Sequence, residues 1–343
     1  MPQFVQNCQV GSENAVGGGV HSSFFKQIAT VENLLAGWYE FVCDKRCKKD
    51  IQIFQLRLMA HILTLYTDLC NKTYRHGPYQ HLTIADPKPR DIHKATVRDR
   101  LLHHAVYRVL YPFFEKRFIA DSFSCRLGKG THRALNRFLD FGKRVSFSHT
   151  KTCWVLKCDI RKFFASIDHS ILLQILSRFI SDPDVILLLG AIIGSFNSGT
   201  KGVGLPLGNL TSQLFVNIYM DEFDQFVKHA LNIKHYIRYA DDFVILSQNR
   251  ENLVSLIPPI SDFLSKKLYL ELHPDKVSII TFSSGVDFLG WVHFPTHRVL
   301  RTSTKRRMFS RVNERNLSSY TGLLKHGNTF FLQEEIQALT TRF

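Results

Sequence analysis

The sequence predicts an α+β fold in which helices flank a β-rich middle, and three observations support this. Apolar residues recur at helical spacing between residues 30 and 69 and again between 97 and 111. Between 153 and 291 the apolar runs are short and are separated by tight turns, which favours an antiparallel sheet. After residue 295 the pattern is again helical, and it is rich in lysine and arginine.

The composition indicates a folded protein that binds a polyanion. The chain has 343 residues, of which 45% are apolar, and this is ample for a core. The formal net charge is +15, and a basic surface gains affinity for nucleic acid by displacing counterions from phosphates. Because there is no run of about 18 apolar residues, and Met1-Pro2-Gln3 does not begin a signal peptide, we expect a cytoplasmic protein with no membrane span.

The seven cysteines are scattered and contain no CxxC pair. Cys43 and Cys47 lie four residues apart, but no second Cys/His pair is nearby to complete a zinc site. We therefore interpret the cysteines as free thiols in a reducing cytoplasm.

The elements expected before residue 153 are mainly helical. A Gly-rich arm over 10–20 precedes them. A short strand over 81–84 should lead into a turn at 86–90, whose two prolines exclude a regular helix. The helices are expected at 30–42, at 51–69, at 97–111 with an end or kink at Pro112, and from Thr131 onward.

The elements expected after residue 153 alternate between strands and helices. The strands are expected at 153–158, 236–239, 243–246, 268–272 and 277–281, with a further segment at 288–291. The helices are expected from Asp168 or Ser170 as cap, over 209–229, and from Pro258 to Lys267.

Two adjacent acids in Tyr239-Ala240-Asp241-Asp242-Phe243 lie between two apolar strands. A tight hairpin would bring both side chains to its tip. Neighbouring carboxylates repel one another unless cations neutralise them, so the pair suggests a metal site. A solvated Asp-Asp turn is the plain alternative when this segment is taken alone.

A second acidic position favours the metal site. Asp159 ends the apolar strand 153–158, and Phe163 and Phe164 follow it closely. Carboxylates at the ends of two neighbouring strands can hold two Mg²⁺ ions about 4 Å apart, with Mn²⁺ as a substitute, and such a pair serves in-line phosphoryl transfer. Asp168 begins a helix, where capping is the expected role.

The order of these residues resembles the palm of reverse transcriptases, in which Phe/Tyr-x-Asp-Asp follows Asp-x-x-x-x-aromatic. The resemblance runs along residues 77–295. It implies a right-hand polymerase fold with fingers, an antiparallel palm and a helical thumb. It also implies RNA-directed DNA synthesis, with a template RNA, a primer duplex and dNTPs as partners. The metal-binding catalytic acids of that family match Asp159, Asp241 and Asp242.

The resemblance also assigns residues to the incoming nucleotide. Phe164 matches the bulky residue that excludes a 2′-hydroxyl, with Phe163 as the competing candidate. Lys276 matches the lysine near the leaving pyrophosphate, and Gln213 ends the segment that matches the loop-to-helix touching the template and the nascent pair.

Further residues are assigned to the template and primer. Phe288 and Gly290 match the primer grip. The loop that touches the template matches Leu207, Gly208 and Ser212.

Two basic loops are expected to face the triphosphate. Flanking prolines present Lys88 and Arg90, and Arg126 lies with Lys129 in a Gly-punctuated loop. This second loop is not a P-loop, because Phe123 occupies a position where a P-loop requires glycine. An ordinary basic surface loop is the alternative.

A basic run follows the primer-grip segment. We expect Lys305, Arg306 and Arg307 to contact phosphates of the template–primer duplex, with an acidic protein partner as the alternative. The run lies along one expected helix and comprises Arg298, Arg301, Lys305, Arg306, Arg307, Arg311 and Arg315. The expected divisions of the chain are an N-terminal helical extension, fingers with palm, and a basic thumb, over 1–75, 76–295 and 296–343.

Within reverse transcriptases, the loop Leu207–Gln213 resembles that of diversity-generating retroelement enzymes. It reads Leu-Gly-x-x-x-Ser-Gln, where group II intron enzymes carry Gln-Gly and Ser-Pro. The segments 86–90, 98–105 and 126–132 also look like that group. The resemblance implies error-prone copying of a template RNA, with an accessory variability determinant protein as partner. Two alternatives are an anti-phage defence reverse transcriptase and a catalytically silent RNA-binding protein; the intact acids disfavour the second.

Overall fold

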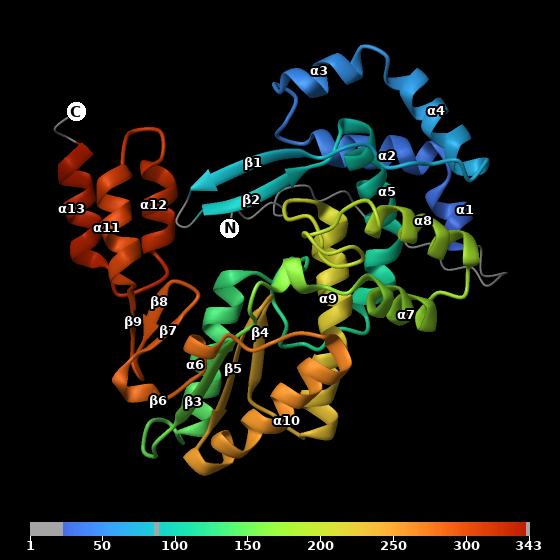
Figure 1. Ribbon diagram of the computed structural model, residues 1–343. Coiled ribbons are helices and arrows are strands. Elements are labelled where there is room, and N and C mark those ends of the chain that lie inside the picture. The colour runs from blue at the N-terminus through green and yellow to red at the C-terminus, as the bar shows by residue number, and fades with distance from the viewer. Residues whose placement is uncertain (1–22, 86–88, 341–343) are drawn as a thin grey trace, which may run out of the picture.

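Figure 1 shows the protein as a computed structural model, which describes residues 23–85 and 89–340. Helices α1–α5 and a two-stranded hairpin form the upper part, and a central sheet with its helices forms the lower part. Three C-terminal helices stand together at one side. The arm expected over 10–20 lies outside the described residues.

The N-terminal part is a group of short helices. The Thr30 side chain caps the second of them by accepting a hydrogen bond from the Asn33 amide. The single helix expected over 51–69 is wrong, because the chain turns at Leu56-Arg57; Leu56 is 85% exposed, so no core contact extends the helix there. The helices are α1 (Phe24–Ile28), α2 (Val31–Val42), α3 (Lys49–Gln55) and α4 (Leu58–Cys70).

An exposed hairpin and a long helix come next. Strands β1 (Gln80–Ala85) and β2 (Pro89–Lys94) pair antiparallel. The strand expected over 81–84 lies within β1, whereas β2 is not among the expected strands and begins at Pro89, inside the segment assigned to a turn. Helix α5 (Val97–Glu115) continues through Pro112, where the sequence suggests an end or a kink. The carbonyl that the proline leaves without a donor is that of Arg108, which is partly exposed, so water can satisfy it.

The central sheet has four antiparallel strands in the order β4-β5-β3-β6, which confirms the predicted α+β class. Its register places Asp159 opposite Asp242. The strands are β3 (Trp154–Asp159), β4 (Tyr236–Tyr239), β5 (Asp242–Ser247) and β6 (Ser278–Thr281).

Helices cover both faces of this sheet. Helices α9 (Leu210–Gln225) and α10 (Arg250–Leu268) pack on one face, and α6 (Thr131–Val145) packs on the other. Because side chains alternate along a strand, each strand supplies both cores. Both faces of the sheet are therefore buried.

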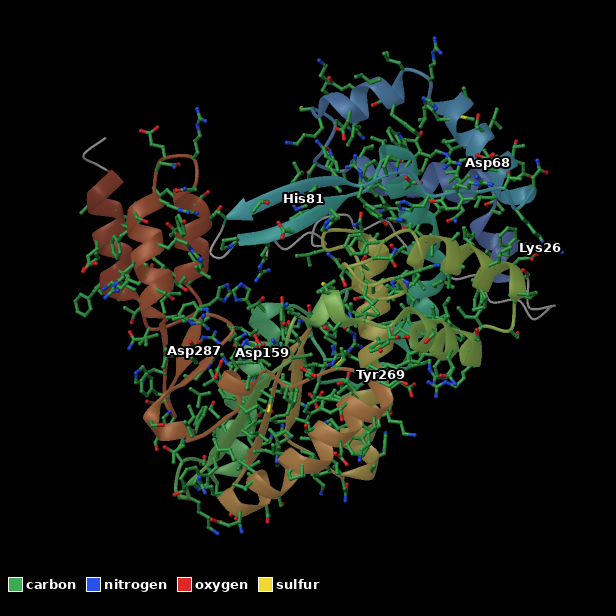
Figure 2. All side chains as sticks on the ribbon, viewed as in Figure 1. Lys26, Asp68, His81, Asp159, Tyr269 and Asp287 are labelled. Carbon is green, nitrogen blue, oxygen red and sulfur yellow. The ribbon has the colours of Figure 1, made fainter. Side chains whose placement is uncertain are left out.

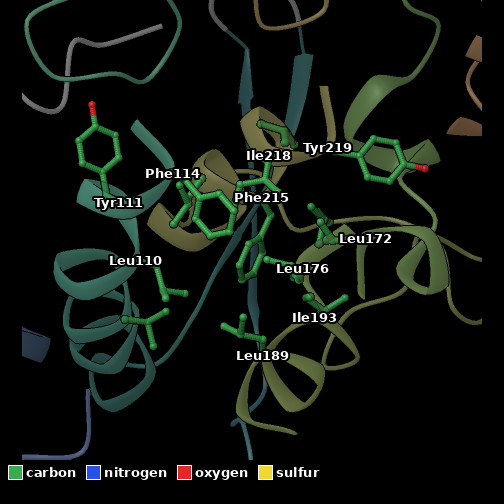
Figure 3. Packing of buried hydrophobic residues seen from close by; sticks show 14 of the residues in the cluster. Leu110, Tyr111, Phe114, Leu172, Leu176, Leu189, Ile193, Phe215, Ile218 and Tyr219 are labelled. Atoms are coloured by element: carbon green, nitrogen blue, oxygen red, sulfur yellow. The ribbon is translucent and has the colours of Figure 1, made fainter. Parts of the chain in front are cut away.

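The larger core joins the sheet to the upper helices. Figure 3 shows Leu110 and Phe114 of α5 turned toward Phe215 of α9, with Leu176 and Leu189 closing the cluster. The last two belong to α7 (His169–Phe179) and α8 (Pro183–Ile193). Asp168 caps α7 by accepting from the amides of Ser170 and Ile171, as expected.

Two expectations around α10 are wrong. The helix begins at Arg250 rather than Pro258, and both prolines lie inside it. Val254 and Ser255, whose carbonyls lose their donors to the prolines, are exposed to water. No strand forms over 268–272, because Tyr269 takes a left-handed conformation, with φ 49°, and ends the helix.

The helix expected over 209–229 consists of two continuous segments. Helix α9 ends at Gln225, and a π-helix continues it over Phe226–Ala230. Near the sheet, short 3₁₀ turns cover Phe163–Ser166, Pro274–Lys276 and Phe282–Ser284.

The C-terminal part combines a small sheet with the three helices. Lys157 of the central sheet donates a 2.7 Å hydrogen bond to the Asp287 carbonyl of the small sheet, and Figure 2 labels Asp287 beside Asp159. The small sheet is antiparallel and has the strands β7 (Val286–Phe288), β8 (Trp291–His293) and β9 (Arg298–Leu300). The helices are α11 (Thr302–Arg311), α12 (Leu317–Leu324) and α13 (Phe330–Thr340).

The basic run does not lie along a single helix. Arg298 belongs to β9 and is 9% exposed, Arg301 precedes α11, and Arg315 follows it. The sequence pattern could not separate these positions because the strand is only three residues long. Among the helices within 23–85 and 89–340, none is long and apolar enough to span a membrane.

Candidate active site

The turn between β4 and β5 brings three carboxylates to one edge of the central sheet. Tyr239 pairs with Asp242, so Ala240 and Asp241 form the two-residue link that we call the acidic turn. Across β3 and β5, Asp242 directly faces Asp159. Side chains of directly opposed residues lie on the same face, with Cβ atoms about 5 Å apart. Figure 2 shows Asp159 at the edge of the sheet that points toward the β1–β2 hairpin.

The acidic turn has an unusual backbone. Ala240 has φ 56°, a left-handed value that costs a non-glycine residue on the order of 1–3 kcal/mol unless its surroundings hold it. The Asp241 carbonyl accepts a 3.3 Å hydrogen bond from the Ile160 amide, which ties the turn to the residue after Asp159. The two acidic positions are therefore linked through the backbone.

The electrostatics of the site favour a cation. Burial raises the pKa of Asp242 to about 6; Lys157 opposes this rise, and the carboxylates of Asp241 and Asp159 add to it. Burial also raises the pKa of Asp241, with Asp159 adding to the effect and Lys276 opposing it. Raised carboxyl pKa values mean that the acids are poorly neutralised by the protein alone. A bound cation would relieve this repulsion.

Lys276 supplies one of the compensating charges. It lies on a 3₁₀ turn, and its Nζ is 2.7 Å from Oδ1 of Asp159. The His273 amide fixes the start of this turn by donating to the Asp159 carbonyl at 2.8 Å. The structure therefore brings Lys276 to the acids across more than one hundred residues of sequence.

The donor set fits Mg²⁺ shared with a bound substrate. Carboxylate oxygens are the ligands that Mg²⁺ prefers, and it commonly keeps waters and substrate phosphates as further ligands. Within the described ranges, no three His, Cys, Asp or Glu side chains are grouped closely enough for a closed metal site. Lys276 also occupies one oxygen of Asp159. These acids suit an ion completed by a nucleotide rather than a structural ion.

Phe163 and Phe164 begin the 3₁₀ turn that follows β3, and they differ in burial. Phe163 is 3% exposed and belongs to the core, whereas Phe164 is only partly buried. The Phe164 carbonyl accepts a 2.8 Å hydrogen bond from the Leu205 amide, which ties the backbone of this residue to the loop that leads into α9. Of the two rings, that of Phe164 is the one partly exposed to solvent.

The loop into α9 presents some of its predicted residues and buries others. Gly208 is exposed and has φ 103°, and a side chain there would collide with Ile92 of β2. Leu207 and Gln213 are partly exposed. Ser212 is 2% exposed, so the expected direct contact of its side chain with nucleic acid is corrected: on the first turn of α9 it faces the core.

The β1–β2 hairpin has one face toward the acids. Cross-strand pairing puts Leu82, Ile84, Arg90 and Ile92 on the same face, and Ile92 lies against Gly208. The positive charge of Arg90 also lowers the pKa of Asp241, although burial dominates there. The structure thus places Arg90 over the site, while Lys88 lies outside the described residues.

A comparison with known protein families identifies the family to which this chain belongs. Residues 85–293, more than half of the chain, match the family model described as reverse transcriptase (RNA-dependent DNA polymerase). The chain belongs to the reverse transcriptase family. Asp159, the acidic turn and Lys276 all lie inside the matched region.

Individual relatives are distant. This reverse transcriptase is 26% identical to protein YkfC of Escherichia coli over 298 residues, covering 74% of each chain. It is 23% identical to the group II intron-encoded protein LtrA of Lactococcus lactis subsp. cremoris over 333 residues, covering 77% of this chain and 54% of LtrA. The chain therefore spans about half the length of LtrA.

Solved structures show the same fold. Apo telomerase from Candida Tropicalis superposes with a TM-score of 0.52 and 12% identity, covering 69% of this chain and 50% of the telomerase. Together with the helices and antiparallel sheets described above, this likeness confirms the right-hand polymerase fold predicted for this reverse transcriptase.

Arg126 requires a correction. Its side chain is 3% exposed, and its Nε and Nη2 atoms donate to Glu115 at 2.9 and 2.6 Å. Nη1 donates to the Ile119 carbonyl and to Ser122. Arg126 therefore holds its own loop to α5 and does not face nucleotide phosphates. Lys129 likewise donates to the Ala120 carbonyl at 2.7 Å.

The primer-grip assignment is corrected in part. Phe288 is fully buried in the smaller core, so its ring cannot contact a primer directly. Leu289 and Gly290 form the turn between β7 and β8, with φ 51° and 88°, and both are partly exposed. The tip of this hairpin, rather than Phe288, is presented to solvent. On α11, Lys305 and Arg307 are partly exposed and Arg306 is exposed.

Sequence reasoning missed two residues that organise the site. Asn209 precedes α9 but does not cap it; its amide donates at 2.7 Å to the His93 carbonyl and ties the β1–β2 hairpin to the loop. Arg238, one residue before Tyr239, is buried beneath the acidic turn. Asn209 bonds to a residue 116 positions away, and Arg238 pairs with Asp224 on a different element, so no local sequence pattern indicates either role.

Proposed function

We propose that this chain is an RNA-directed DNA polymerase, with Asp159, Asp241 and Asp242 as its catalytic acids. The observation that carries the proposal is the direct opposition of Asp159 and Asp242 beside the acidic turn, inside the region that matches the family. The raised pKa values of Asp241 and Asp242 add support, since a bound cation would offset their repulsion.

The same acids would hold two Mg²⁺ ions, or Mn²⁺ in their place. When bound, such ions neutralise charge on the attacking and leaving oxygens of an in-line phosphoryl transfer. Lys276 directs its ammonium group at the same edge and can donate to a departing phosphate. Arg90, on the face of the hairpin above, can pair with the triphosphate, and Gln213 borders the nascent pair.

The nucleic acid would lie between the acids and the C-terminal helices. We assign Leu207, Gly208 and the Leu289-Gly290 turn to the template and primer. Lys305, Arg306 and Arg307 would bind phosphates of the duplex without regard to sequence. This assignment keeps the division into an N-terminal extension (1–75), fingers and palm (76–295) and thumb (296–343) as a proposal, with β9 included in the thumb.

Primer extension tests the proposed activity. The purified full chain, an RNA template annealed to a DNA primer, dNTPs and Mg²⁺ should yield DNA complementary to the template. Chelation of the metal, or digestion of the RNA before the reaction, should remove the product. Failure to extend any RNA-templated primer, with the template–primer still bound, would refute the polymerase and leave the silent RNA-binding protein.

The sugar specificity can be tested at Phe164. A ring beneath the ribose clashes with a 2′-hydroxyl, so Phe164→Val should raise ribonucleotide incorporation relative to dNTP by roughly tenfold or more. Phe163→Leu is the matched control, because Phe163 is in the core and its truncation should lower stability without changing sugar selection. If the wild type and Phe164→Val discriminated equally between dNTPs and ribonucleotides, Phe164 would not be part of the nucleotide site.

The biological setting we infer is mutagenic retrohoming in a diversity-generating retroelement, in the cytoplasm. The Leu207–Gln213 motif supports it, and an accessory variability determinant protein would be the partner. The gene neighbourhood decides: a variable target with a near-repeat supports the retroelement, and a defence island supports the anti-phage alternative.

A further inference from the structure

Arg238 lies on β4 beneath the acidic turn and is 1% exposed. Its guanidinium forms a two-pronged ion pair with Asp224 of α9, with Nε at 2.8 Å from Oδ1 and Nη2 at 2.7 Å from Oδ2. Asp224 is completely buried. The pair therefore fixes both the position and the orientation of the guanidinium plane.

The third nitrogen of Arg238 reaches the turn itself. Nη1 donates to the Ala240 carbonyl at 3.2 Å and lies 3.4 Å from Oδ1 of Asn217. Ala240 is the residue with the left-handed φ of 56°. The next carbonyl, that of Asp241, accepts from the Ile160 amide. Each carbonyl of the acidic turn thus has its own donor, one from Ile160, just after β3, and one from Arg238.

Stability alone does not account for this ion pair. Burying two charges is costly, and replacing a buried pair by apolar residues of similar volume is often neutral or stabilising. What an apolar replacement cannot supply is a fixed donor under the turn. The Tyr236 hydroxyl also donates to Oδ1 of Asp224, at 2.7 Å, and its bond to this carboxylate rather than to the turn makes it an internal comparison.

We propose that Arg238 is a positioning residue for the acidic turn, an inference that rests on the proposed polymerase function. Asp224 orients the guanidinium, the guanidinium holds the Ala240 carbonyl, and the held backbone sets the direction of the Asp241 carboxylate. Asp224 lies on α9, the helix that begins at the template-side loop. The acidic turn and the template-side loop are therefore joined through Arg238, Asp224 and α9.

The first test is Arg238→Lys, which keeps the positive charge and loses the planar fork. We expect kcat for primer extension to fall roughly 10- to 100-fold, because small misplacements at a reacting centre have effects of that size. The dissociation constant of template–primer should stay within about twofold, since the basic surface is unchanged. Binding of Mn²⁺, followed by electron paramagnetic resonance without template or nucleotide, should weaken severalfold.

Tyr236→Phe is the matched control. It removes one hydrogen bond to the same Asp224 and leaves the contact between Arg238 and the Ala240 carbonyl in place. Its thermal stability should fall, while its kcat and its Mn²⁺ affinity should match the wild type.

A third variant separates positioning from stability. Arg238→Met, Asp224→Leu and Tyr236→Phe together replace both charges of the ion pair and the tyrosine hydroxyl by apolar groups, so the protein should fold with a melting temperature near that of the wild type. Its kcat and Mn²⁺ affinity should nevertheless fall as in Arg238→Lys.

The outcomes separate the two proposals. Wild-type kcat and Mn²⁺ affinity in both folded Arg238 variants would overturn the positioning role while leaving the polymerase intact. A wild-type protein that fails to extend any primer would refute the polymerase. The Mn²⁺ measurement would still test Arg238 in that case: weaker binding in the two Arg238 variants than in Tyr236→Phe supports it, and equal binding overturns it.

Discussion

Two hairpins meet at the site, and they differ in how they are held. The β4–β5 hairpin is at the edge of a four-stranded sheet, and Tyr236, Ile237, Phe243 and Val244 on it are fully buried. Within the described part of the chain the β1–β2 hairpin has no third strand, and β1 is exposed along its entire length. The first carries Asp241 and Asp242, and the second carries Arg90.

The difference assigns separate tasks to the two hairpins. A two-stranded ribbon is marginally stable in water, and regions with few buried apolar contacts open most easily. The β1–β2 hairpin is tied at its base by Asn209, whose amide bonds the His93 carbonyl, and by the His93 amide, which donates to the Leu207 carbonyl. We infer that the buried hairpin fixes the chemistry and that the exposed one adjusts to the nucleotide.

The largest effect is expected on the buried hairpin. Asp242→Asn should abolish extension, because it removes a metal ligand, yet it should stabilise the metal-free protein at neutral pH. The folded pKa of Asp242, about 6, is above the unfolded value of 3.8, so the neutral form is favoured on folding. That stability is complete below pH 4 and is lost as the pH rises through 6.

Thermal unfolding in a chelator gives the measurement. The free energy of unfolding of the variant should exceed that of the wild type by an amount that grows between about pH 4 and 7 and reaches about 3 kcal/mol, since each unit of pKa shift corresponds to about 1.4 kcal/mol. A difference that does not vary with pH would contradict the assigned shift.

A smaller effect is expected for Arg90 on the exposed hairpin. Arg90→Gln should raise KM for dNTP by about tenfold, because hydrogen bonds to charged groups contribute about 1.5–3 kcal/mol. Template–primer affinity should change little. His81→Gln, on the opposite face of the same hairpin, is the control and should leave KM unchanged. If both variants behaved alike, Arg90 would not face the triphosphate.

Removing the hydrogen bond at the base of the β1–β2 hairpin should raise KM for dNTP severalfold. Asn209→Ala removes the hydrogen bond to the His93 carbonyl, so KM for dNTP should rise while the rate at saturating dNTP is retained. Asn249→Ala is a matched control, because Asn249 is a true cap of α10 and its loss should cost only about 1 kcal/mol of stability. If a folded Asn209→Ala variant had an unaltered KM for dNTP, the hydrogen bond that holds the hairpin would have no part in nucleotide binding.

The smallest effect on chemistry is expected where neither hairpin is touched. Charge removal at Lys305, Arg306 and Arg307 should weaken template–primer binding and reduce its salt slope by about one per lost contact. Single-turnover incorporation at saturating substrate should be unchanged. An unchanged salt slope would make α11 a protein-docking surface instead.

Local patterns predicted the acidic edge well. Short apolar runs and a two-residue link are enough to place β4, β5 and β3, and the strand ends then bring Asp159, Asp241 and Asp242 together. Side-chain direction in loops and the first turns of helices is set by distant partners. Arg126 turns inward to Glu115, and Ser212 turns into the core, for reasons that no spacing reveals.

Helix boundaries failed for a related reason. Pro258 and Pro259 suggest a helix start, yet α10 passes through them because the freed carbonyls belong to exposed residues. Exposure is a property of the folded chain, and so is the buried pair of Arg238 and Asp224. The sequence thus predicts which residues carry the chemistry, and the structure adds those that hold them in place.

Single-turnover extension by Asp159→Asn and Asp241→Asn tests the central claim most directly. Both substitutions preserve size and remove a metal-binding charge, so we predict no Mg²⁺-dependent extension on an RNA template. Template–primer affinity should stay within about twofold of wild type, since the basic surface is retained. Extension by either variant at close to the wild-type rate would contradict the assignment of these acids as the catalytic centre.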